Sequence, residues 1–224
     1  MHQLISRKIS IYLFLFFLLV SINNNSIINF KIPKINRIEI TGLNFDESKE
    51  IKKIIEKLNL KNIFLINQKK IQQDIIKVNT IEELSIFKKY PSTLKVDIRK
   101  TEFLAITKKN GFDYYIGSNG KLIKKDKSFL KLPYVFGNLN IEEFLKLKNY
   151  VDMSNLKFDE IINLYFYKSK RWDIETSEGY LIKLPKDNVK KNLDLFVRLS
   201  NDGKFKDNSI IDFRQKDQII LDAR

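Results

Sequence analysis

Hydrophobic periodicity predicts two folded units, the first of which has a simple order of elements. The stretch INRIEITG at 35–42 alternates apolar and polar residues, as a half-buried strand does. Residues 45–60 and 67–79 instead place apolar side chains at the i, i+3, i+4, i+7 spacing of amphipathic helices. Alternation returns in 81–90 and 93–99. The order β-α-α-β-β predicts two helices covering one face of a three-stranded sheet.

Polar residues at the expected helix starts support these assignments. Asp46 and Glu47 place negative charge where it stabilises a helix N-terminus. Asn67 precedes the second apolar stripe and is a residue type that caps helices well.

The second unit, from about residue 103, has shorter strand-like runs. Ser118-Asn119-Gly120 separates two apolar runs and is typical of a β-hairpin turn. The stretch LPYVFG at 132–137 is predicted to be a loop. Helices are predicted at 141–150 and 188–202, and strands in 161–185 and from 209 onward. This pattern predicts an α+β fold, a mainly antiparallel sheet with two helices.

The N-terminus carries a charged and then apolar segment. Arg7 and Lys8 precede an apolar run from Ile9 to Ile22, and asparagines end it. A helix over residues 9–22 rises about 21 Å, against a hydrocarbon core of about 30 Å. No A-x-A-like cleavage site follows, so an uncleaved anchor is favoured over a cleaved signal peptide. The basic flank predicts a cytoplasmic tail at 1–8, a transmembrane anchor at 9–24 and export of the remaining chain.

Composition narrows the classes of partner. The chain has 41 Lys and Arg against 27 Asp and Glu, a net charge of +14. Such a surface can attract nucleic acid, anionic lipid or an acidic polymer. The basic residues are spread along the sequence instead of forming one arm, which does not favour nucleic acid. The chain has no cysteine, which excludes disulfides and thiolate metal sites.

The sequence shows no catalytic constellation. His2 is the single histidine and precedes the apolar run, and no hydrolase, metalloprotease or phosphate-loop motif occurs. Trp172, the single tryptophan, is expected to be a core residue on a strand. The adjacent carboxylate pairs are interpreted as solvated groups: Asp46-Glu47, Glu82-Glu83, Glu142-Glu143 and Asp159-Glu160. We therefore expect a binding or scaffold protein with no cofactor, metal, nucleic acid or small-molecule substrate.

Several stretches, in this order and behind an apolar segment, resemble the FtsQ/DivIB family of bacterial cell-division proteins. These are INRIEITGL (35–43), YPSTLKVDI (90–98), YIGSNGKLI with LPYVFG (115–137), RWDIETSEGYLIKLP (171–185), NLDLFVRL (192–199) and IIDFRQKDQIIL (210–221). There are departures: KTEFLA replaces the family's E-R-x-P-x-A, Gly117 replaces a frequent Asp, and Phe213 replaces Leu in the I-D-L-R word.

The resemblance implies a POTRA domain at 33–101 and an FtsQ-type β domain at 102–224, behind a single anchor in the inner membrane at the division site. It also implies a non-enzymatic divisome scaffold that binds FtsB-like and FtsL-like proteins and helps to regulate septal peptidoglycan synthesis. Other divisome members would bind the POTRA domain.

In the family, the FtsB contact is a strand added to the edge of the β domain, where unpaired backbone groups complete a ladder. The residues that the resemblance assigns to this contact are Lys170, Arg171, Arg214, Gln215, Lys216, Asp217, Gln218, Ile219, Ile220 and Leu221. Three alternatives stay open: an ordinary edge strand protected by Lys216 and Asp217, a POTRA-bearing transport or outer-membrane assembly factor, and an exported enzyme with a different fold.

Overall fold

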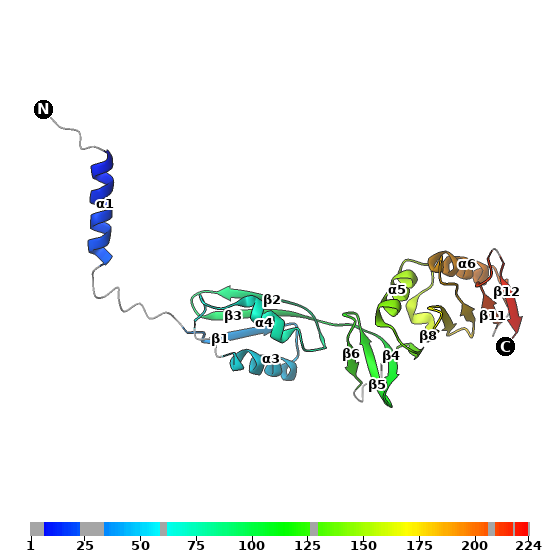
Figure 1. The fold of residues 1–224 in the computed structure, drawn as a ribbon. Coiled ribbons are helices and arrows are strands. Elements are labelled where there is room, and N and C mark those ends of the chain that lie inside the picture. Colours follow the sequence, from blue (N-terminus) through cyan, green and yellow to red (C-terminus); the bar gives the residue numbers. More distant parts are fainter. Residues whose placement is uncertain are drawn as a thin grey trace.

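The computed structural model describes residues 7–22, 34–58, 62–125, 130–205, 209–216 and 218–223. These residues form one isolated helix and two units, each of which combines a sheet with helices (Figure 1). Helix α1 spans Arg7–Ile22. Among the described residues, no helix combines the length and the apolar character needed to cross a bilayer. Residues 1–6, 23 and 24, parts of the predicted tail and anchor, lie outside the described residues.

The N-terminal sheet has the strand order β1-β3-β2. Strand β1 (Arg37–Thr41) pairs parallel with β3 (Thr93–Lys100), and β2 (Ile81–Lys89) pairs antiparallel with β3. Helices α3 (Phe45–Lys57) and α4 (Gln68–Ile75) lie between β1 and β2 in the chain. The observed order β-α-α-β-β is the order that the hydrophobic pattern predicts.

Local capping explains where these two helices begin. The Asn44 side chain accepts a hydrogen bond from the Glu47 backbone N–H, and Glu47 accepts one from the Asn44 N–H, which forms a capping box. Asn67 caps α4 by accepting from the Lys70 N–H, as predicted. Apolar residues of both helices and of the sheet form one buried cluster, which includes Ile55, Ile71 and Val96.

The C-terminal sheet has nine strands in the order β12-β11-β10-β9-β8-β7-β4-β5-β6. The strands are β4 (Phe103–Lys109), β5 (Phe112–Gly117), β6 (Leu122–Lys124), β7 (Tyr134–Gly137), β8 (Ile161–Phe166), β9 (Trp172–Thr176), β10 (Leu181–Lys183), β11 (Ser209–Asp212) and β12 (Ile220–Ala223). Helix α5 (Ile141–Asp152), the short 3-10 helix η1 (Phe158–Glu160) and helix α6 (Val189–Asn201) complete the unit. Trp172 is 5% exposed in the core of this unit, as expected.

One expectation about this sheet needs correction. The stretch 132–137, predicted to be a loop, contains strand β7, which pairs parallel with both β4 and β8. A four-residue strand between two parallel neighbours needs no alternation, so its sequence carries no strand signal. β10 and β11 form a further parallel pair, while the remaining pairs are antiparallel, so the sheet is mainly antiparallel as predicted.

The predicted hairpin turn joins the two units. Asn119 donates from Nδ2 to the carbonyl oxygens of Asn79 (2.8 Å) and Ile81 (2.9 Å), both in the N-terminal unit. Lys121 Nζ lies 2.5 Å from the Ile76 carbonyl oxygen at the end of α4, where a cation is favourable. The β5–β6 turn therefore docks on the end of the N-terminal unit.

Candidate partner-binding edge

Strand β12 is the last strand at one edge of the nine-stranded sheet (Figure 1). It pairs antiparallel with β11, with Ile211 opposite Leu221 and Asp212 opposite Ile220. All four residues of β12 are exposed, and Leu221 has an exposed fraction of 52%. The strand begins five residues later than the predicted edge, which began at Gln215.

Hydrogen-bond direction shows which backbone groups of β12 point away from the sheet. The Phe213 N–H donates to the Lys183 carbonyl of the β10 side, at 2.9 Å. Because successive N–H groups of a strand point to opposite sides, the N–H groups of Ile210 and Asp212 point towards β12. The backbone N–H and C=O groups of their partners, Asp222 and Ile220, therefore point back towards β11 and pair within the sheet.

Leu221 and Ala223 consequently direct their backbone groups to the open edge. The Ala223 N–H already donates a hydrogen bond to the side chain of its neighbour, Asp222 Oδ1, at 2.9 Å. Leu221 is the position at which an added strand finds both an outward N–H and an outward C=O.

A groove lies next to this edge, on the side of α6. It has a volume of about 590 Å³. One wall comes from the segment before β12 and the other from the loop before α6 and the helix itself. The lining residues are Pro185, Lys186, Asp187, Asn188, Lys191, Asn192, Leu195, Phe213, Arg214, Gln215, Lys216, Gln218 and Ile219. The groove is therefore lined mainly by basic and amide side chains, together with four apolar residues, Pro185, Leu195, Phe213 and Ile219.

Arg214 is held in place by a neighbour two residues away. Its Nε lies 2.8 Å from Asp212 Oδ1, and its Nη2 lies 2.5 Å from Asp212 Oδ2. The Arg214 side-chain hydrogen bond lowers the pKa of Asp212 and outweighs partial burial, which acts to raise it. A partner carboxylate would have to share Arg214 with Asp212.

Arg171 and Arg214 both act electrostatically on one hydroxyl group, that of Tyr167. The Tyr167 hydroxyl donates to Asp173 Oδ2 at 3.1 Å. Partial burial and the Asp173 carboxylate raise the pKa of Tyr167, and Arg214 and Arg171 act to lower it. Asp173 is itself 4% exposed, and its burial raises the pKa of this carboxyl despite the Tyr167 hydrogen bond.

Lys170 takes a separate position in the turn between β8 and β9. Its φ is 60°, and its N–H donates to the Tyr167 carbonyl at 2.9 Å. The side chain lines a smaller hollow of about 200 Å³ together with Trp172, Lys186 and Asp187. This hollow and the groove share the loop at Pro185–Asp187.

The predicted residues thus divide into four groups. Lys170 and Arg171 lie between β8 and β9. Ile220 and Leu221 lie in β12. Arg214, Gln215, Lys216, Gln218 and Ile219 line the groove, and Asp217 lies outside the described residues. The sequence prediction missed Asp212, Tyr167 and the 185–188 loop. The sequence did contain a signal for Asp212. It precedes Arg214 by two residues, and side chains at that spacing lie on the same face of an extended segment.

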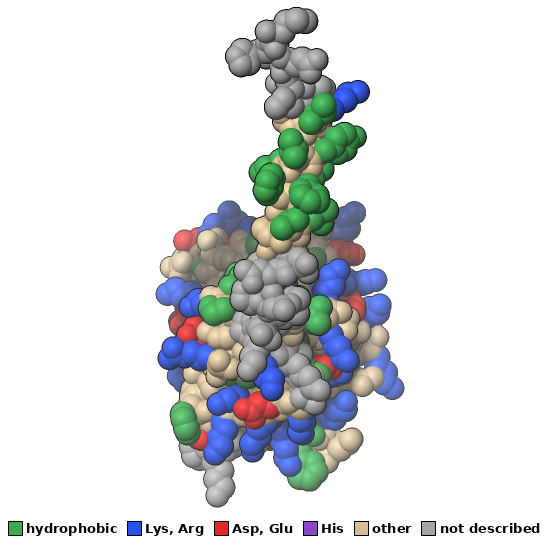
Figure 2. Space-filling model, turned by 90° about the vertical axis from the view of Figure 1, so that its left-hand side faces the viewer, with side chains coloured by type: hydrophobic (Ala, Val, Ile, Leu, Met, Phe, Trp, Pro, Cys, Tyr) green, Lys and Arg blue, Asp and Glu red, His purple; other side chains and the backbone are tan. Residues whose placement is uncertain are grey.

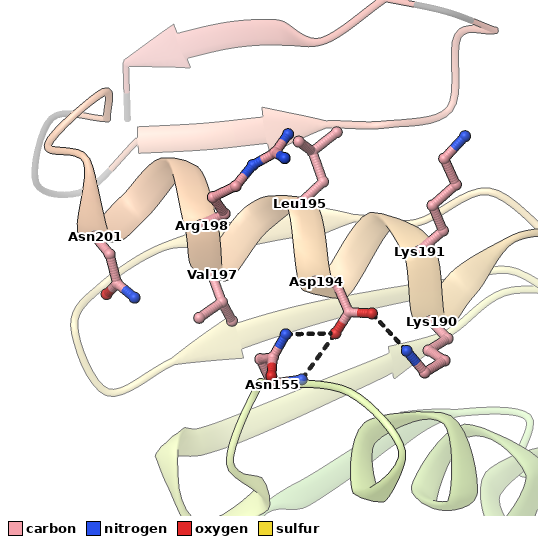
Figure 3. A pocket seen from close by; sticks show the side chains of 8 residues that line it. All are labelled: Asn155, Lys190, Lys191, Asp194, Leu195, Val197, Arg198 and Asn201. Atoms are coloured by element: carbon pink, nitrogen blue, oxygen red, sulfur yellow. Dashed lines mark hydrogen bonds and ion pairs between the residues drawn. The ribbon is translucent and has the colours of Figure 1, made fainter.

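A larger hollow of about 970 Å³ runs along α6 (Figure 3). Asp194 accepts from the Asn155 backbone N–H at 2.9 Å and from Lys190 Nζ at 2.6 Å, and these bonds lower its pKa. Lys191, Leu195 and Arg198 lie on the side of the helix that faces β11 and β12 (Figure 3). Within the described part of the chain, no cluster of His, Cys, Asp or Glu is suited to hold a metal ion.

Comparison with known proteins identifies both units. Residues 34–100 match the family model "POTRA domain, FtsQ-type", and residues 105–214 match "Cell division protein FtsQ/DivIB, C-terminal". Among curated relatives, the Staphylococcus aureus (strain NCTC 8325 / PS 47) cell division protein DivIB is 24% identical over 193 residues, which are 81% of this chain and 44% of that protein. The cell division protein FtsQ of Rickettsia bellii is 23% identical over 192 residues, 84% of this chain and 72% of that protein.

The chain spans less than half the length of the S. aureus relative. Among solved structures, the major extracytoplasmic domain of DivIB from Geobacillus stearothermophilus aligns with a TM-score of 0.35 and 12% identity. The alignment covers 47% of this chain and 98% of that one.

Proposed function

Because the chain belongs to the FtsQ/DivIB family of bacterial cell division proteins, we propose that it is a non-enzymatic scaffold of the divisome that binds an FtsB-like partner at the free edge of β12. The observation that carries the proposal is the outward N–H and C=O of Leu221 on an exposed edge strand. An extended partner segment would complete this ladder.

The groove beside β12 supports the same proposal. Arg214, Lys186, Lys191 and Lys216 place positive charge next to the edge. Such charges at an interface rim mainly accelerate association and select for an acidic partner. An FtsL-like protein would join through the same complex, and septal peptidoglycan synthesis would be regulated through it.

We also propose the membrane placement and the domain limits. The side chains of α1 from Ile11 to Val20 are 42–69% exposed wherever they are large and apolar, which suits contact with lipid. Residues 9–24 would anchor the chain in the inner membrane, with residues 1–8 cytoplasmic. Residues 33–101 and 102–224 would then act outside the cytoplasm at the division site.

The N-terminal unit would recruit other divisome members. Both β1 and β2 are edge strands of its sheet, so either one offers a ladder to a partner. The rival role in transport or outer-membrane assembly is not favoured, since both family matches are to FtsQ/DivIB types.

A binding titration tests the edge. The full chain in detergent is titrated with the extracytoplasmic segment of the FtsB-like protein from the same organism. Leu221→Pro removes the outward N–H and leaves the β11 ladder, which uses Ile220 and Asp222. Leu221→Ala is the matched control, because it shortens the side chain and keeps the N–H.

Loss of binding in the folded proline variant, with binding retained in the alanine variant, is the expected result. Equal binding by both variants would show that the partner does not bind at β12. Ile219→Pro tests the groove segment in the same assay, since Ile219 packs against the core just before the strand.

A further inference from the structure

One end of the N-terminal unit combines exposed apolar residues with a ring of basic residues. This end, called the basic tip below, consists of residues 62–67 and 88–92 together with the start of β1. Phe64, Leu65 and Tyr90 are 52%, 82% and 59% exposed. Their clustering is unusual for a solvated surface of a small domain.

Contacts across the basic tip hold its loops together. The rings of Phe64 and Tyr90 stack with centroids 4.9 Å apart. Lys88 Nζ donates to the Phe64 carbonyl at 3.3 Å. The Asn36 N–H donates to the Ser92 carbonyl at 3.0 Å, which joins the 88–92 turn to the start of β1. The apolar side chains are therefore presented by a fixed scaffold.

The charges around these rings are almost all positive. The basic residues at or next to the tip are Lys34, Arg37, Lys69, Lys70, Lys88 and Lys89. Glu39 is paired with Lys89 at 3.0 Å. Lys69 and Lys70 occupy the first turn of α4, which has no acidic residue, and a helix dipole does not favour cations there. Their placement gives the helix no stability and points to a role at the surface.

The basic tip is the end from which the chain continues towards α1. Eleven residues, 23–33, connect Ile22 to Lys34, and a chain of that length reaches at most about 40 Å. Viewed from this side, Lys and Arg side chains occupy much of the surface, with hydrophobic side chains between them (Figure 2).

We propose that the basic tip rests on a bilayer surface that contains anionic lipid, with Phe64, Leu65 and Tyr90 in the interfacial layer. Aromatic and leucine side chains partition into that layer, and each nearby basic residue strengthens binding to an anionic surface by about fivefold. The proposal rests on the membrane placement of α1 proposed above. The contact would fix the orientation of the N-terminal unit relative to the membrane surface.

The test uses the absence of cysteine from the chain. Leu65→Cys and Phe45→Cys each give a single labelling position at matched exposures of 82% and 83%. Phe45 begins α3, after the far end of β1, and so serves as the control. The full chain is reconstituted into vesicles of phosphatidylcholine alone, or of phosphatidylcholine with phosphatidylglycerol. Quenching of the fluorescent label by a lipid-borne quencher is then measured.

The expected result is strong quenching at position 65 in the anionic vesicles, weaker quenching in the neutral vesicles and little at position 45. In the background of Lys69→Glu with Lys70→Glu, quenching at 65 should fall to the level at 45. These substitutions place acidic residues at a helix N-terminus, so they should not unfold α4.

Equal quenching at 65 and 45, in a chain that floats with the vesicles, would overturn the proposal, leave the anchor intact and indicate a protein partner for the tip. Quenching unaffected by the two glutamates would refute the choice of anionic lipid. A chain that floats with neither kind of vesicle would refute both this contact and the anchor.

Discussion

The docking of the β5–β6 turn on the N-terminal unit makes a sharp prediction for Asn119→Ala. The substitution removes two hydrogen bonds between the units, to Asn79 and Ile81, and one within the turn, to the Lys121 N–H at 3.0 Å. Each such bond contributes about 0.5–1.5 kcal/mol net. Because Asn119 is half-buried and water can reach the freed carbonyls, the lower part of the range applies, about 2 kcal/mol in total.

Thermal unfolding of the full chain in mild detergent measures this loss. A loss of about 2 kcal/mol should lower the melting temperature by about 4–8 °C for a chain of this length. Fluorescence of Trp172 reports on the C-terminal unit, while far-ultraviolet circular dichroism reports on both. The two transitions should coincide in the parent and separate in the variant, because the bonds couple the units.

Asn201→Ala is the control, at an exposed residue on the last turn of α6 that makes no side-chain hydrogen bond with the described residues. The reasoning fails if Asn119→Ala loses no more stability than Asn201→Ala. It also fails if the two probes remain coincident after a loss of the expected size, since the turn would then stabilise only its own unit.

Two further substitutions test local features of the C-terminal unit. Gly137→Ala should destabilise the fold by at least about 3 kcal/mol, because φ is +103° and an added Cβ would lie 2.1 Å from the Phe166 carbonyl oxygen. Gly111→Ala, with φ +82° and no atom within 4 Å, should lose only about 1–2 kcal/mol, and equal melting temperatures for the two variants would contradict the clash. Arg214→Ala should destabilise most at neutral pH, because the folded-state pKa of Asp212 is lowered and its contribution is present above the unfolded value. The difference in melting temperature from the parent should shrink as the pH falls below about 4, and a difference that is constant down to acid pH would show that the Asp212 pairing does not stabilise the fold.

The sequence by itself determined the features that depend on neighbouring residues. Helices α3 and α4 follow from apolar stripes and from capping residues a few positions away, such as Asn67. The hairpin turn at Ser118–Gly120 follows from local backbone preference. Burial of Trp172 was also predictable, because a large apolar side chain in a strand gains most from the core.

Only the tertiary structure decided the features that depend on partners distant in the chain. Strand β7 exists because β4 and β8 supply its hydrogen bonds, and no local pattern encodes those neighbours. The edge strand is Ile220–Ala223, whereas the predicted strand began at Gln215, because β11 pairs with those four residues. The direction of the Leu221 backbone groups, and the meeting of Phe64 with Tyr90, likewise depend on register and packing that a linear sequence does not display.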